Sequence, residues 1–116
     1  MRIVNESKKS TIANYVILAD TFFGRLKGLM FRRNLDIGEG LMLSPCNMIH
    51  TFGMRFNLDI IFLSKDNVVL YIIENFPPGK SSPMIHKANR VIELPVGTLK
   101  KSDTKLGDYL TFNHAL

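Results

Sequence analysis

The sequence of residues 46–63 is CNMIHTFGMRFNLDIIFL, and this stretch decides how the chain folds. From position 54 onward the side chains alternate, so that one face carries Met54, Phe56, Leu58, Ile60 and Phe62 and the other carries Arg55, Asn57, Asp59 and Ile61. This alternation predicts a β-strand with one face against the core. The first half places Cys46, the only cysteine, and His50 among apolar residues, where unpaired polar groups are costly. We therefore expect either a functional site here or a polar network that holds the fold together.

Short apolar segments on both sides of this stretch predict further strands. They lie at residues 15–19, 41–43, 68–73, 90–94 and 109–112. SKDN at 64–67 predicts a hairpin turn, and FPPGKSSPM at 76–84, which holds three prolines, predicts the longest loop. Many short strands separated by turns predict a mainly β fold, a jelly-roll-like β-sandwich or barrel.

The sequence favours one short helix near residues 21–31. Asp20 and Thr21 are good N-cap residues, and apolar side chains then follow at helical spacing, at Phe22, Leu26, Leu29 and Met30. A second, shorter helical turn is expected near Leu99.

Length and composition predict a single domain over residues 1–116, with residues 1–13 as an N-terminal extension or edge strand. The chain is 46% hydrophobic and 22% charged, the balance of a soluble globular protein. No apolar run reaches the roughly 18 residues of a membrane span, and the N-terminus is polar, which predicts a cytoplasmic protein without a membrane partner. One cysteine cannot form an internal disulfide.

The net charge of +5 favours anionic partners weakly. Two stretches lack acidic residues: the first holds Arg25, Lys27, Arg32 and Arg33, and the second holds Lys80, His86, Lys87 and Arg90. Such residues usually form a solvated surface, so nucleic-acid or anion binding is retained only as a second alternative. Glycine-rich phosphate-binding patterns are absent, which argues against a nucleotide-binding enzyme.

With these elements placed, the chain resembles the family known as domain of unknown function 192. The resemblance rests on Gly28 to Met30, on Leu58 to Phe62, and on Gly107 with Asp108, and it spans residues 19 to 112. It implies a compact, mainly β fold of the jelly-roll or barrel type with no established activity. His50 stands where many family members carry an aromatic residue, which indicates that its ring can serve as a flat packing surface.

Cys46 and His50 suggest a thiol nucleophile with an imidazole base. In an extended strand their spacing of four residues spans about 13 Å, so only a turned backbone would bring them together. An inert, packed cysteine is the simpler interpretation. Cys46, His50 and Met54 are also weak candidates for a soft metal site, but one cysteine and scattered histidines favour no metal and no cofactor.

Asp59 lies between Leu58 and Ile60 in the predicted central strand. It could be a catalytic acid or a ligand-binding group if it is dry and unpaired. We prefer a structural role, in which its carboxylate accepts hydrogen bonds from backbone amides and fixes the hairpin.

Together these features predict a shallow pocket bordered by the loops at 46–53 and 76–84. We expect His50, Phe52, Arg55 and Asp59 to line it, with Arg55 binding an anionic group of a small molecule or peptide. The favoured function is a non-enzymatic binding or accessory module that is a monomer or weak oligomer. The alternative is a thiol-dependent or hydrolytic enzyme that uses Cys46 and His50.

Overall fold

The computed structural model describes residues 1–21, 32 and 34–113. In these ranges the chain forms strands β1 (Arg2–Asn5), β2 (Ser10–Ala13), β3 (Tyr15–Ala19), β4 (Glu39–Leu43), β5 (Leu58–Ser64), β6 (Val69–Phe76), β7 (Ala88–Pro95) and β8 (Leu110–Asn113), and helix α2 (Thr98–Ser102). The helical turn expected near Leu99 is thus confirmed as α2. The helix expected near 21–31 lies almost wholly outside the described residues. No helix in the described part is long and apolar enough to cross a membrane.

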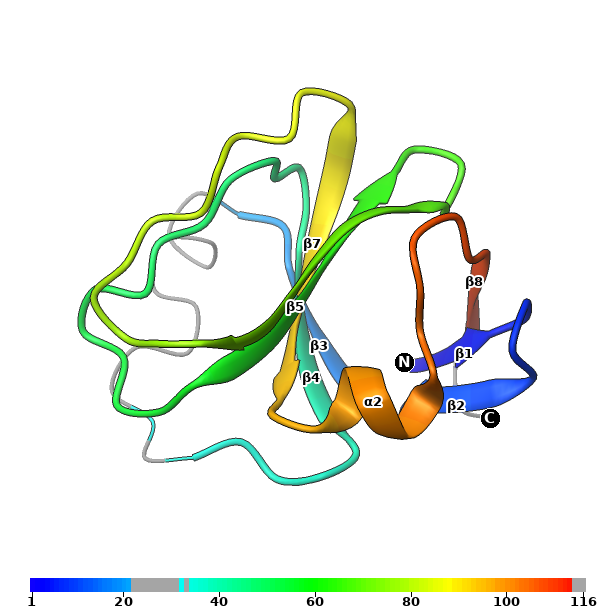
Figure 1. Ribbon diagram of the computed structural model, residues 1–116, viewed down its shortest axis with the longest axis horizontal. Coiled ribbons are helices and arrows are strands. Elements are labelled where there is room, and N and C mark those ends of the chain that lie inside the picture. The colour runs from blue at the N-terminus through cyan, green and yellow to red at the C-terminus, as the bar shows by residue number, and fades with distance from the viewer. Residues whose placement is uncertain (22–31, 33, 114–116) are drawn as a thin grey trace.

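The strands form two sheets that make one compact, mainly β domain (Figure 1). The smaller sheet has the order β2-β1-β8 and the larger has the order β3-β4-β7-β5-β6. Neighbouring strands are antiparallel except β3 and β4, which pair in parallel. The predicted mainly β architecture is confirmed, and within the described residues the two sheets do not close into a barrel.

Strand β5 lies between β6 and β7 and is buried on both faces. On one face Ile61 and Leu63 pack into a cluster with side chains of the smaller sheet and α2. On the other face Ile60 and Phe62 pack into a second cluster beneath the loops. The expectation of a single buried face is therefore wrong, because each side of the larger sheet has its own cover. A nearly continuous apolar run such as DIIFL is typical of a strand buried on both faces.

The central strand is also shorter than the alternation predicts. It begins at Leu58, because the preceding chain turns and the Met54 N–H donates to the Thr51 carbonyl over 3.1 Å. Met54 and Phe56 still pack against the second cluster. Their alternation with polar residues therefore reflects which side chains are buried, although this segment is not part of a strand.

The carboxylate of Asp59 is 1% exposed and accepts three backbone hydrogen bonds. Its Oδ1 accepts from the Asn75 N–H at 3.0 Å, and its Oδ2 accepts from the N–H groups of Gly97 and Leu99, each at 3.0 Å. These amides are the partners that a structural role requires. Asp59 therefore joins β5 to the end of β6 and to the start of α2.

A second buried polar network joins the chain ends. Asn5 is fully buried and donates to an Asp108 carboxylate oxygen at 2.9 Å, and Lys8 contacts both Asp108 oxygens at 2.9 Å. Burial raises the pKa of Asp108, but hydrogen bonds from Asn5, the Lys105 N–H and Lys8, together with the charge of Lys8, outweigh it and lower that pKa overall. The ionised carboxylate thus holds β1 to the loop that precedes β8.

Candidate functional site

Two loops at the left of Figure 1 lie side by side and form what we call the loop platform, residues 44–57 and 77–87. Backbone hydrogen bonds join them along their length. The Thr51 N–H donates to the Lys80 carbonyl at 2.8 Å, and the Ser82 N–H donates to the Ile49 carbonyl at 2.8 Å. The Ile85 N–H donates to Asn47 at 2.9 Å. The loops predicted to border the site are thus one continuous surface.

Two buried hydroxyl groups reinforce the loop platform. The Thr51 hydroxyl donates to the Pro77 carbonyl at 2.7 Å and accepts from the Lys80 N–H at 3.0 Å. The Ser82 hydroxyl accepts from the Ile49 N–H at 2.9 Å and donates to the Pro83 carbonyl at 2.9 Å. Ile49 is buried in the cluster above the larger sheet and anchors the platform there. Backbone groups that no strand satisfies are therefore paired by side chains.

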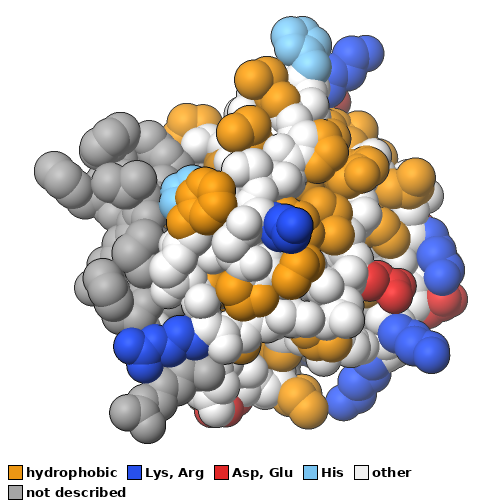
Figure 2. Space-filling view, turned by 60° about the vertical axis from the view of Figure 1, so that its left-hand side comes forward, with side chains coloured by type: hydrophobic (Ala, Val, Ile, Leu, Met, Phe, Trp, Pro, Cys, Tyr) orange, Lys and Arg blue, Asp and Glu red, His pale blue; other side chains and the backbone are white. Residues whose placement is uncertain are grey.

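Apolar and aromatic side chains cover the outer surface of the platform. The rings of His50 and Phe52 stack with centroids 5.2 Å apart and planes 24° apart. Phe52 is 52% exposed, and Met48 and Met84 are 45% and 64% exposed. Figure 2 looks onto this side of the molecule, where hydrophobic and basic side chains are interspersed.

The platform carries positive charge without compensation in its own sequence. Arg55, Lys80 and Lys87 are exposed on it, and neither 44–57 nor 77–87 contains an aspartate or glutamate. His50 and His86 are exposed as well. Loops that combine exposed apolar side chains with basic groups and no acid of their own are complementary to an acidic partner that also carries apolar side chains.

The predicted site residues fall into two places. His50, Phe52 and Arg55 belong to the platform, and the first two contact each other. Asp59 is buried, with its oxygens directed at the amides of β6 and α2. Three of the four residues therefore belong to the first loop of the platform, and the Asp59 carboxylate supports the fold.

Cys46 lies at the margin of the platform. Its thiol donates to the Met48 carbonyl at 3.2 Å, and the residue packs partly against the cluster that contains Ile49. The imidazole of His50 stacks on Phe52. Among the described residues, no group of three or more His, Cys, Asp or Glu side chains is placed to hold a metal ion.

The sequence interpretation missed Glu93. This residue lies in β7 and is 4% exposed, with Leu41 of β4 and Ile60 of β5 directly beside it in the sheet. Burial raises its pKa to about 7, and the structure gives its carboxylate no hydrogen bond within the described residues. The sequence signal was an acid inside the apolar segment VIELP, the same signal that drew attention to Asp59.

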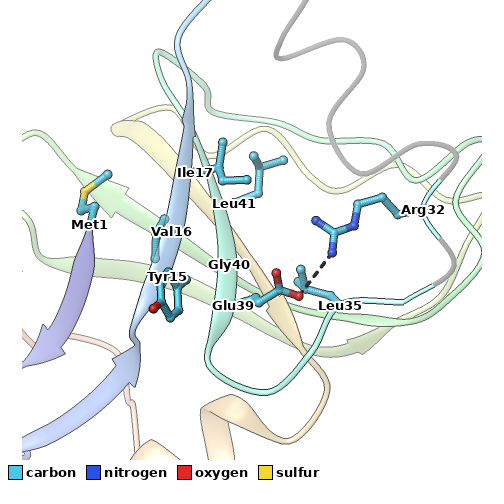
Figure 3. Close-up of a pocket in the computed structure, with 9 residues that line it drawn as sticks. All are labelled: Met1, Tyr15, Val16, Ile17, Arg32, Leu35, Glu39, Gly40 and Leu41. Carbon is cyan, nitrogen blue, oxygen red and sulfur yellow. Dashed lines mark hydrogen bonds and ion pairs between the residues drawn. The ribbon is translucent and has the colours of Figure 1, made fainter. Parts of the chain in front are cut away.

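A cavity of about 200 Å³ lies elsewhere, against β3 and β4 (Figure 3). Ile17 and Leu41 form part of its wall, and Arg32 reaches across to Glu39 with a nitrogen–oxygen distance of 3.2 Å. Because Arg32 is paired there, this cationic group of the first basic stretch is already neutralised. The other three members of that stretch lie outside the described residues.

These features define a small two-sheet β domain with a basic, apolar loop platform. The chain matches the family model DUF192, described as Uncharacterized ACR, over residues 3–112, and it belongs to this family. Curated relatives named UPF0127 protein are found in Thermococcus species. The T. gammatolerans protein is 32% identical over 96% of this chain and 74% of its own length, and the T. sibiricus protein is 30% identical over 91% and 71%.

Two solved structures share the fold. A protein of unknown function from Novosphingobium aromaticivorans DSM 12444 is 26% identical with a TM-score of 0.81, covering 96% of this chain and 82% of its own. A protein from Sinorhizobium meliloti 1021, whose description proposes a transcription regulator, is 28% identical with a TM-score of 0.78, covering 95% and 89%. The chain thus belongs to a family whose function is uncharacterised.

Proposed function

We propose that this protein is a non-enzymatic binding module whose loop platform binds a peptide segment that carries both acidic and apolar side chains. The observation that supports this most is the composition of the platform. The same two loops carry its exposed apolar residues and the exposed Arg55, Lys80 and Lys87, and no acid occurs in either loop. Binding surfaces combine such apolar anchors with a few charged groups that set orientation.

Each side chain of the platform has a distinct role in this proposal. The stacked rings of His50 and Phe52 offer a flat surface for an aromatic or aliphatic side chain. Met48 and Met84 adapt their shape to different partners. Arg55 pairs with a carboxylate through its planar guanidinium group. The hydrogen bonds between the loops hold these groups in place before binding, which limits the entropy lost on association.

The proposal is tested by selecting peptides from a random display library on the purified protein. We expect the selected peptides to combine Asp or Glu with aromatic or aliphatic residues and to bind with micromolar affinity. The double substitution Arg55→Glu/Lys80→Glu should lower the affinity for a selected peptide at least about tenfold, because it replaces electrostatic attraction with repulsion. The matched control is Lys100→Glu/Lys101→Glu at two exposed positions of α2. It changes the net charge by the same amount and should leave binding intact.

Selection of peptides without acidic residues, or equal loss of binding in both double variants, would refute the proposal. Nucleic-acid binding is the competing function, and the description of the S. meliloti protein motivates its inclusion. Arg90 of the second basic stretch stacks over Phe112 at 4.9 Å and bonds Asn67, so it is engaged within the fold. The competing test measures the affinity for a DNA or RNA duplex at about 50 and about 200 mM salt. A steep loss of affinity, as expected for several phosphate contacts, would favour nucleic-acid binding instead.

A further inference from the structure

The loop platform carries two methionine side chains that are exposed to solvent, one in each of its loops. Met48 is 45% exposed and Met84 is 64% exposed. Elsewhere in the described part of the chain, Met42 is 4% exposed, and Met1 and Met54 pack partly against the core clusters. Within these residues, the well-exposed thioether groups therefore lie on the surface that we propose to bind peptides.

Hydrogen bonds between the loops place these two methionines opposite each other. The Ile85 N–H donates to the Asn47 carbonyl at 2.9 Å. The Ser82 N–H donates to the Ile49 carbonyl at 2.8 Å. The two segments therefore run antiparallel, and one methionine lies between the two bonded positions of each loop. Backbones that are joined in this way lie about 5 Å apart.

Both methionines are on the outer side of the platform. Ile49, which follows Met48, is buried in the cluster above the larger sheet. Ile85, which follows Met84, packs partly against the same cluster. The isoleucines thus attach the two loops to the core, while the methionines beside them meet solvent. The result is a pair of accessible thioether groups, one on each side of the line where the loops join.

We infer that Met48 and Met84 form a paired oxidation site, at which hydrogen peroxide converts the apolar surface of the loop platform into a polar one. At each residue a sulfur lone pair attacks one peroxide oxygen, the O–O bond breaks and a sulfur–oxygen bond forms. The proton of the attacked oxygen passes to the other oxygen, which leaves as water. The thioether is oxidised to the sulfoxide by two electrons, and one peroxide molecule is reduced.

The product changes the surface and leaves the core packed. A thioether is apolar and flexible, whereas a sulfoxide is polar and accepts hydrogen bonds. Because both side chains are exposed, the new oxygens are solvated where they form. The platform keeps the charges of Arg55 and Lys80 and loses apolar contact surface. Methionine sulfoxide reductases reverse this reaction, so the change can act as a switch. That oxidation lowers peptide affinity rests on the proposed function.

Mild treatment with hydrogen peroxide, followed by peptide mapping with mass spectrometry, tests the site directly. The parent protein is Cys46→Ser, so that the thiol does not compete for the oxidant. We expect Met48 and Met84 each to gain one oxygen at least about fivefold faster than Met42 and Met54, because access to the sulfur controls the reaction. Equal rates at the four positions would overturn the inference.

Two further readouts measure the change of surface in protein whose Met42 is still reduced. The oxidised parent should elute earlier than the reduced parent from a hydrophobic-interaction column. Its dissociation constant for a peptide selected on the platform should rise at least about fivefold, and the reductases should restore both properties. The matched control is Met48→Leu/Met84→Leu, which keeps apolar side chains of similar volume, does not react and should show neither change.

These readouts separate a failure of the oxidation site from a failure of the proposed function. Unchanged elution after both methionines have gained oxygen, or an equal shift in the leucine variant, would overturn the site. A shift in elution with constant peptide affinity would overturn its role as a switch. Failure to select any acidic peptide would refute the proposed function, and the column would still decide whether oxidation changes the surface.

Discussion

The carboxylate of Asp59 accepts a hydrogen bond from the backbone N–H of Leu99 over 3.0 Å, linking the central strand to the start of α2. Asn75 and Gly97 donate to the same carboxylate, so three amides depend on one buried side chain. An anion that accepts several backbone hydrogen bonds organises the chain segments that donate them. The conformation of the turn after β7 therefore depends on a charge located in β5.

We expect Asp59→Asn to lower the free energy of unfolding by about 2 to 3 kcal/mol. The amide group of asparagine presents a donor where one oxygen accepts, so at least one buried N–H loses its partner. Urea denaturation followed by circular dichroism measures the change. Asp103→Asn, at an exposed position after α2, is the control and should change the free energy of unfolding by less than about 0.5 kcal/mol. An Asp59→Asn protein as stable as wild type would contradict the structural role.

The buried carboxyl of Glu93 predicts that the fold weakens as pH rises. In the unfolded chain this group titrates near 4.5, whereas burial raises its pKa in the folded protein to about 7. Between these values the folded state holds a proton that the unfolded state has lost, so the free energy of unfolding falls with increasing pH. The stabilisation from the protonated Glu93 is complete below the unfolded-state pKa and is lost as the pH rises through the folded-state pKa. The total loss is about 3 kcal/mol of unfolding free energy.

Denaturation of wild type and Glu93→Gln between pH 4.5 and pH 8.5 tests this dependence. Glutamine has a similar shape and does not titrate, so the difference in unfolding free energy between the two proteins should change by about 3 kcal/mol over the range, in favour of Glu93→Gln at high pH. Parallel pH profiles for the two proteins would show that Glu93 does not carry a raised pKa.

Local patterns predicted most strands of this fold because β-branched and apolar runs such as YVILA favour extended structure wherever they pack. They could not show that Ile61 and Ile60 face two different covers, since that depends on which segments fold over each side of the sheet. The pairing of β1 with β8 joins residues more than a hundred positions apart, and no short-range signal reports it. Glu93 was missed because one acid in an apolar strand indicates burial without naming a partner.

The two loops of the candidate site could be located from the sequence, but the contact between them could not. Proline, glycine and serine placed the second loop, and the isolated polar residues placed the first, but the contact between the loops is made by backbone groups. Sequence patterns report on side chains, whereas hydrogen bonds between the backbones of two loops leave no pattern in the sequence. The burial of Asp59 and its hydrogen bonds to α2 depend on tertiary structure, which the sequence does not show. The residue was therefore expected to line the pocket.

We expect the thiol of Cys46 to react slowly with iodoacetamide at neutral pH in the folded protein. The residue is partly buried and its thiol contacts the Met48 carbonyl at 3.2 Å, so a reagent has restricted access to the sulfur. Alkylation followed by mass spectrometry should accelerate at least about tenfold in urea. Rapid alkylation of the folded protein, lost in a His50→Ala variant, would instead support the thiol-dependent enzyme.

The hydroxyl of Thr51 provides a test of whether the loop platform must be rigid to bind. Thr51→Val keeps the shape of the side chain but leaves the Pro77 carbonyl and the Lys80 N–H without their partner, which should cost about 1 to 3 kcal/mol of stability. If the two loops must be held together for binding, affinity for a selected acidic peptide should also fall, by a factor of about five or more, in protein that is still folded. Thr11→Val, on an exposed position of β2, is the matched control and should change neither quantity appreciably. Full peptide affinity in a destabilised Thr51→Val protein would show that the exposed side chains alone determine binding, without the hydrogen bonds beneath them.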